Sequence, residues 1–180
     1  PDLGGTQPAG RRSWRAPAFW EILEAAGQRT VCLNWPFTAP AERWSGRHVD
    51  HLFPMATPVQ EPWPVPLHSV TPAAWRQKLT PLRVHPGDAL DAQMAALLPE
   101  LPAIDPENEP WPDWLRSILA HATTMHAVAT EVAATADWDL LCVTYDLLTV
   151  RRFLGGAAAA PPGSPFWRYR LVEGGMAMLL

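Results

Sequence analysis

The chain has 180 residues, of which 48% are hydrophobic and 18% charged, a composition typical of one folded domain with a sizeable core. Its net charge is −4 and no basic run exceeds two residues, so a nucleic-acid partner is not expected. No apolar run approaches the roughly 20 residues that a membrane span needs, so a membrane partner is not expected either.

The first predicted elements are a helix and a strand. Residues 1–16 are predicted to be loop. Pro17 then opens a helix over residues 18–26, because proline is tolerated at the first helical position, and Gly27 provides a left-handed stop. A buried strand over residues 29–34 follows directly. A helix and a strand this close form half of a βαβ unit, so an opening strand is expected before residue 1.

A proline-rich stretch follows, and many of the 21 prolines lie in it. Residues 37–112 are therefore predicted to be a surface insert of loops and short helices within a single domain, residues 1–180. At most a short strand is predicted near residues 48–53. Helices are predicted at residues 71–79, with Thr71 as N-cap and Pro72 at the first helical position, and at residues 88–98.

The longest predicted helix spans residues 112–134. Its apolar residues recur every three or four positions, so one face is expected to pack on a sheet. That stripe comprises Trp114, Leu115, Ile118, Leu119, Ala122, Met125, Ala129, Val132 and Ala133. His126 falls inside the stripe and His121 at its edge. They diverge by about 140° around the helix, so they are predicted to pack or to be solvated, not to share a metal ion.

The apolar run over residues 138–145 is predicted to be the central strand, buried on both faces of a parallel sheet. Ligands of open α/β sheets bind just beyond the carboxyl ends of strands. Asp146, Thr149, Arg151 and Arg152 stand there, and they include no metal-binding set. A flexible lead and a final amphipathic helix at about residues 166–179 follow, and more sheet is expected after Leu180.

Two further groups of residues are interpreted as structural. His48, Asp50 and His51 lie close in sequence, but their spacing matches no established metal site, so a ligand role is not predicted. Cys32 and Cys142 each fall inside a predicted strand. Two such cysteines are more often core residues than a disulfide or a metal pair.

Several segments stand in order along the chain and together suggest a family. They are Pro17-Ala-Phe-Trp20, Asn34-Trp-Pro36 with Thr38 and Pro40-Ala-Glu42, Gly46 with Val49-Asp50, Leu82-Arg-Val-His-Pro-Gly87, residues 125–130, Trp138-Asp-Leu-Leu with Tyr145-Asp146, and Tyr169 with Val172. This order resembles the middle of the type I phosphodiesterase/nucleotide pyrophosphatase family, which belongs to the alkaline phosphatase superfamily. The resemblance covers almost the whole chain.

The resemblance implies a doubly wound α/β fold, mainly parallel and flanked by helices, of which this chain would hold a part that is incomplete at both ends. It also implies hydrolysis of phosphoric esters by two zinc ions, which clamp the attacking and leaving oxygens. The family's Asp and Thr or Ser nucleophile would lie before residue 1, and its Ser-Asp-His-Gly segment would lie beyond Leu180.

The chain departs from the family where the zinc ligands should follow the central strand. The family's Asp-x-x-x-His pair falls on Thr149 and Phe153, or, with a small deletion, on Leu148 and Arg152. Neither alignment supplies a carboxylate and an imidazole. Asp146 is near the ligand position without matching it. The chain is therefore expected to bind no zinc, to need no cofactor and to be inactive.

Two other hypotheses remain open. In one, Arg151 and Arg152 bind an anionic, phosphate-bearing small molecule, since arginine forks suit phosphate; the simpler alternative for both is a solvated turn. In the other, the chain is an unrelated structural α/β protein.

Overall fold

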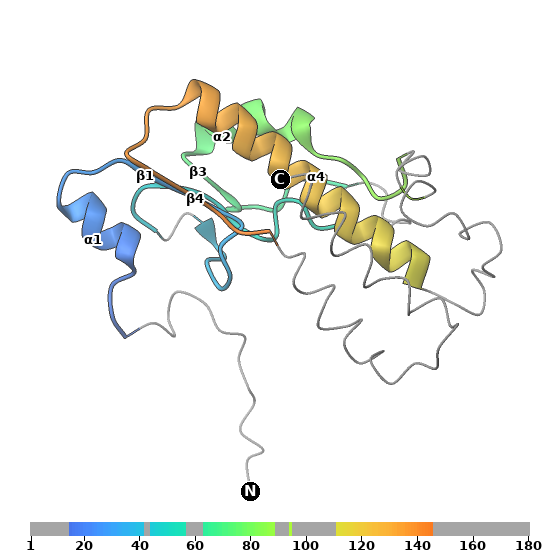
Figure 1. The fold of residues 1–180 in the computed structure, drawn as a ribbon, viewed down its shortest axis with the longest axis horizontal. Helices are drawn as coiled ribbons and strands as arrows, with labels where there is room; N and C mark the ends of the chain where they lie inside the picture. Colours follow the sequence, from blue (N-terminus) through green and yellow to red (C-terminus); the bar gives the residue numbers. More distant parts are fainter. Residues whose placement is uncertain (1–14, 42–43, 57–62, 89–93, 95–110, 146–180) are drawn as a thin grey trace, which may run out of the picture.

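The computed structural model describes residues 15–41, 44–56, 63–88, 94 and 111–145 (Figure 1). In chain order the elements are α1 (Phe19–Ala25), β1 (Thr30–Leu33), β2 (Arg47–Val49), β3 (Val70–Thr71), α2 (Ala73–Leu79), the 3-10 helix η3 (Thr80–Leu82), α4 (Trp111–Thr135) and β4 (Leu140–Val143). None of the helices in these residues combines the length and apolar character that would let it cross a membrane.

The strands of the described residues form one mixed sheet in the order β3-β2-β1-β4. β1 runs parallel to both of its neighbours, and β3 is antiparallel to β2. The carboxyl ends of β2, β1 and β4 therefore lie along the same edge. Strands that run mainly parallel and pack against helices confirm the predicted α/β class.

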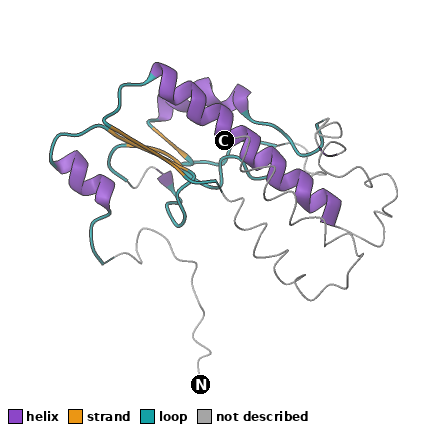
Figure 2. Cartoon of the chain, in the orientation of Figure 1, coloured by secondary structure: helices purple, strands orange, loops and turns teal. Residues whose placement is uncertain are grey.

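Helices cover both faces of this sheet (Figure 2). Successive side chains of a strand point to opposite faces, and β1 follows this rule. Val31 and Leu33 belong to a core that includes residues of α4 and α2. Cys32, between them, packs with Trp20 of α1. All four residues of β1 are buried, as the sequence predicted.

α4 confirms the longest predicted helix to within one residue at each end. Its buried stripe is formed by Ala120, Thr124, Met125, Val128, Ala129 and Val132. Two residues assigned to the stripe, His126 and Ala133, are exposed, so that part of the prediction was wrong. The buried face is centred on Met125, Val128 and Val132. His126 and Ala133 each follow a buried residue by one position and are rotated from it by about 100°, which turns them toward solvent.

The starts of the two shorter helices also differ from the prediction. α1 begins at Phe19, and Pro17 precedes the cap residue Ala18, whose N–H donates to Glu21 Oε2 (2.9 Å). Gly27 has φ +81° and ends the turn after α1, as expected. Thr71 does not cap α2, because it pairs with His48 as part of β3, and Pro72 takes the cap position.

β4 is shorter than the predicted strand of residues 138–145, and each of its four residues is only partly buried. The expectation of a strand buried on both faces was therefore wrong. Within the described part of the chain β4 lies at the edge of the sheet, and β1 is the strand with a neighbour on each side. The predicted helix at residues 88–98 lies mostly outside the described residues, as does the whole helix at 166–179.

Side chains fix the register of β1 against β4. At the start of the two strands, Arg29 donates from Nε (3.0 Å) and its second terminal nitrogen (2.9 Å) to the Asp139 carboxylate, which also accepts the Arg29 backbone N–H (2.8 Å). This bidentate pair holds the pKa of Asp139 well below its usual range. The pair sets which residues of β1 and β4 face each other at the opposite end.

Candidate functional site

The carboxyl ends of the parallel strands bring together the polar residues of the candidate site. Asn34 follows β1, Asp50 follows β2, and Thr144 and Tyr145 follow β4. In open α/β sheets, ligands bind just outside the carboxyl ends of the parallel strands. α4 contributes His121 and His126 to the same edge, through the contacts described below.

Asn34 is the central residue of this group. It is 1% exposed and adopts the left-handed conformation with φ 56°. Its backbone N–H donates to the Val49 carbonyl (2.7 Å), and its Nδ2 donates to the Thr144 carbonyl (2.8 Å). His121 Nε2 lies 3.1 Å from Asn34 Oδ1 and, because an amide oxygen only accepts, must carry the proton. One amide therefore joins β1, β4 and α4.

Asp50 is a buried carboxylate that organises the loops around it. Oδ2 accepts the Ala41 N–H (3.1 Å) and Oδ1 accepts the Leu52 N–H (2.9 Å). These bonds favour the charged form, but burial disfavours it more strongly and raises the pKa of Asp50 to about 6. Asp50 is thus buried and binds the backbone of its own loops.

His126 and Tyr145 form the outer part of the site. His126 Nδ1 lies 3.1 Å from the Tyr145 hydroxyl, and the two ring centroids are 6.2 Å apart. His126 is exposed, whereas partial burial raises the pKa of the Tyr145 phenol. The pair presents one hydroxyl and one imidazole to solvent at the end of β4.

The structure does not bring His48, Asp50 and His51 together as ligands. His48 is fully buried, its Nε2 lies 2.7 Å from the Ser45 carbonyl, and its ring packs edge-on against Trp20. This burial lowers the pKa of His48. The ring belongs to the aromatic core on the α1 side of the sheet, and a metal-ligand role has no support there.

The zinc pair that the resemblance implies requires carboxylate and imidazole groups that converge on one point. In the part of the chain that the structure describes, no three His, Cys, Asp or Glu side chains are grouped to hold a metal ion. The two oxygens of Asp50 are occupied by backbone N–H groups, and the imidazoles of α4 contact Asn34 and Tyr145. These residues do not fit a zinc centre.

The sequence-predicted residues beyond the central strand are not placed by the structure. Asp146, Thr149, Arg151 and Arg152 lie outside the described residues. The anion site at Arg151 and Arg152 therefore stays a prediction.

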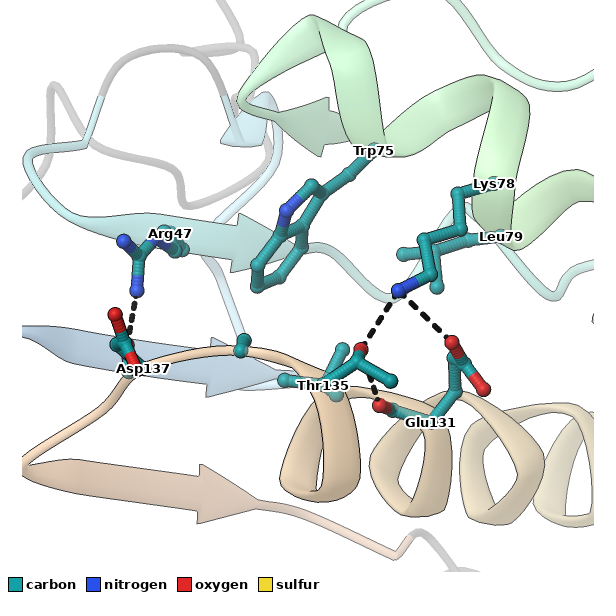
Figure 3. A pocket seen from close by; sticks show the side chains of 9 residues that line it. Arg47, Trp75, Lys78, Leu79, Glu131, Thr135 and Asp137 are labelled. Atoms are coloured by element: carbon teal, nitrogen blue, oxygen red, sulfur yellow. Dashed lines mark hydrogen bonds and ion pairs between the residues drawn. The ribbon is translucent and has the colours of Figure 1, made fainter.

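A pocket of about 260 Å³ lies at the opposite end of the sheet, between the start of β2, α2 and the last turns of α4 (Figure 3). Lys78 Nζ pairs with Glu131 (2.8 Å) and Thr135 (2.7 Å). Arg47 lies beside the Trp75 ring, 5.8 Å from its centroid, and donates to the Asp137 carbonyl. Lys78 is paired with Glu131, Arg47 binds a backbone carbonyl, and the Asp137 carboxylate lies near Arg29 (3.6 Å), so the charged groups of this pocket already have partners in the chain.

Sequence reasoning missed the role of Asn34 and the contacts of His121. Asn34 is the polar residue at the end of the predicted strand, directly before Trp35-Pro36. Asparagine is among the few residues that tolerate positive φ, so its place at a strand end was the available indication. Its partners lie 87 and 110 residues away in sequence, and no local pattern identifies them.

Comparisons with known proteins give no relative for this chain: no family model, no curated protein and no solved structure matches it.

Proposed function

We propose that this chain is a degenerate relative of the zinc-dependent phosphodiesterase/nucleotide pyrophosphatase hydrolases that keeps their α/β frame and does not itself hydrolyse phosphoric esters. The observation that carries the proposal is the order of the polar strand ends. Asn34, Asp50 and Tyr145, from three segments of the resemblance, share the carboxyl edge of three neighbouring parallel strands.

The inactive half of the proposal rests on the residues that follow β4. A two-metal centre needs ligands from several segments, and the positions that should supply the Asp and His hold Thr149 and Phe153, or Leu148 and Arg152. The hydroxyl and imidazole of the Tyr145–His126 pair do not replace them, because a metal clamp acts through paired positive charge.

The first test measures zinc and activity in the purified chain. We expect no stoichiometric zinc after dialysis against zinc-containing buffer, and no hydrolysis of bis-p-nitrophenyl phosphate above the buffer rate. Two bound zinc ions together with turnover of this substrate would refute the inactive assignment.

The second test restores the ligand pair in each alignment. Thr149→Asp/Phe153→His and Leu148→Asp/Arg152→His are compared with the control Thr149→Asn/Phe153→Leu, which supplies no such pair. If the frame is that of the family, one of the first two variants should gain saturable cobalt(II) binding, visible as new d–d absorption bands. If neither differs from the control, the resemblance does not describe this edge of the sheet.

A third measurement distinguishes the degenerate hydrolase from the anion-binding domain. Titration with inorganic pyrophosphate, followed by tryptophan fluorescence, should show no saturable change in the parent chain. Saturable binding that disappears in Arg151→Ala/Arg152→Ala would instead favour a non-catalytic anion-binding domain.

A further inference from the structure

The two cysteines of the chain face each other across neighbouring strands. Cys32 lies in the middle of β1 and Cys142 in the middle of β4, and the register of this parallel pair places them directly opposite. Both side chains contact the aromatic core on the α1 face. Both are free thiols, and each influences the pKa of the other. The sequence predicted two separate core residues and gave no indication of this pairing.

The backbone spacing at this position suits a disulfide. Neighbouring strands lie about 4.8 Å apart, which falls inside the range of about 4.4–6.8 Å between the Cα atoms of bridged cysteines. The Cβ atoms of a bridge lie about 3.8 Å apart, so closing it would draw the two strands slightly together. A bridge under such strain is easier to reduce than a relaxed structural one.

We infer that Cys32 and Cys142 form a reversible disulfide between β1 and β4, which acts as a redox-sensitive clasp beneath the candidate site. Cys32 is buried and Cys142 is partly exposed, which gives the two thiols different roles. Cys142 is the thiol that meets an oxidant, and Cys32 is the one that resolves the intermediate.

The exchange uses a low-molecular-weight disulfide such as oxidised glutathione as the oxidant. The Cys142 thiolate attacks one sulfur of that disulfide, and the first glutathione leaves as a thiolate that takes up a proton. The Cys32 thiol then loses its proton and attacks the Cys142 sulfur, which expels the second glutathione. Two protein thiols are oxidised, and one glutathione disulfide is reduced to two thiols.

The environment of the two thiols controls the rate of their oxidation. Burial raises the pKa of both cysteines, so little thiolate is present near neutral pH. Oxidation should therefore be slow at pH 7 and should accelerate with rising pH. The clasp would respond to sustained oxidation and not to brief exposure.

The clasp lies two residues from the polar contacts of the site. Asn34 follows Cys32 by two positions, Thr144 follows Cys142 by two, and the Asn34 amide donates to the Thr144 carbonyl. Movement of β1 toward β4 at the cysteines is therefore transmitted to this hydrogen bond. The oxidised and reduced chains should differ at the carboxyl edge of the sheet.

The test incubates the full chain with graded ratios of oxidised to reduced glutathione at pH 8, followed by acid quench, alkylation and intact mass measurement. The expected product has lost two hydrogen atoms, carries no alkyl group, and returns to the thiol form with dithiothreitol. Peptide mapping should place the bond between Cys32 and Cys142. The side-chain amide resonance of Asn34 should shift on oxidation.

Two single variants assign the order of events. Cys32→Ser should accumulate a mixed disulfide with glutathione at Cys142, whereas Cys142→Ser should remain unmodified while folded. Circular dichroism confirms that each variant is folded, and alanine at the same position, Cys32→Ala or Cys142→Ala, replaces a serine variant that is not. The inference is overturned if both thiols of the folded parent stay alkylatable at every ratio, or if the bond forms only between chains or only in urea.

Discussion

Asp50 gives the most quantitative prediction, because burial and hydrogen bonding act on it in opposite directions. Three backbone N–H groups, of Leu52, Ala41 and Phe53, stabilise its charged form, yet burial prevails and raises the pKa from its ordinary 3.8 to about 6. The side chain belongs to a residue that is 1% exposed, so solvent screening is small. At about 1.36 kcal/mol for each pKa unit, the difference corresponds to about 3 kcal/mol.

Whether stability rises or falls with pH depends on which state, folded or unfolded, binds the proton of Asp50 more tightly. Between pH 3.8 and pH 6 the folded protein keeps Asp50 protonated while the unfolded chain releases the proton. The folded state is therefore favoured most below pH 3.8, and this contribution is lost as the pH rises through 6. Asp50→Asn removes the titration. The stability of the parent minus that of the variant should fall by about 3 kcal/mol from pH 3.5 to pH 7.5.

The assay is urea unfolding followed by tryptophan fluorescence at half-unit pH intervals. His48, whose pKa burial lowers, changes stability in the opposite direction below its ordinary pKa of 6.5, but it is present in both proteins and cancels in the difference. Val128→Ala is the control, because it destabilises the core without changing an ionisable group. A flat difference curve for Asp50→Asn would show that the N–H bonds balance burial, and a curve that rises with pH would show that they outweigh it; either result contradicts the prediction.

Three further predictions concern stability and are measured by the same urea unfolding at fixed pH. Gly27→Ala should lower the free energy of unfolding by about 1–2 kcal/mol, because its backbone is left-handed and no atom obstructs an added Cβ. Gly46→Ala should lower it by about 3 kcal/mol, because its backbone is also left-handed and an added Cβ would lie 2.5 Å from Thr30 Oγ1. Equal losses for the two variants would contradict the effect of this close contact. A double-mutant cycle of Asn34→Ala and His121→Ala should give a coupling of about 1 kcal/mol for their hydrogen bond, and zero coupling would remove His121 from the site. Trp20→Ala, at a fully buried ring, should cost about 3–5 kcal/mol, and a loss below about 1 kcal/mol would show that the α1 face is not a packed core.

The elements that the sequence predicted well have strong local patterns. α4 repeats its apolar residues over more than six turns, so errors at single positions such as His126 did not change its assignment. β1 is short but uninterrupted and is bounded by Gly27 and Trp35-Pro36. β3 was missed because it has only two residues and runs directly into Pro72, so it carries no periodicity.

The site was harder to predict because its contacts are set by register. Asn34 and Asp50 follow β1 and β2 at the edge where ligands were expected, whereas the residues predicted beyond β4 lie outside the described part of the chain. The partners of Asn34 depend on how β4 aligns with β1 and on how α4 crosses the sheet. The same register places the two cysteines opposite each other, although each taken alone matched an ordinary core residue.

The pairing of β1 with β4 also has a consequence for synthesis of the chain. The polar contacts at both ends of this pair join residues separated by 110 positions. At about 5–20 residues per second, the ribosome needs roughly 5–20 s to deliver β4 after β1 has formed. During that interval one edge of β1 has no strand to bind it, and exposed edges of buried strands promote aggregation. Until β4 emerges, the edge of β1 that will bind it is therefore available for pairing with another chain.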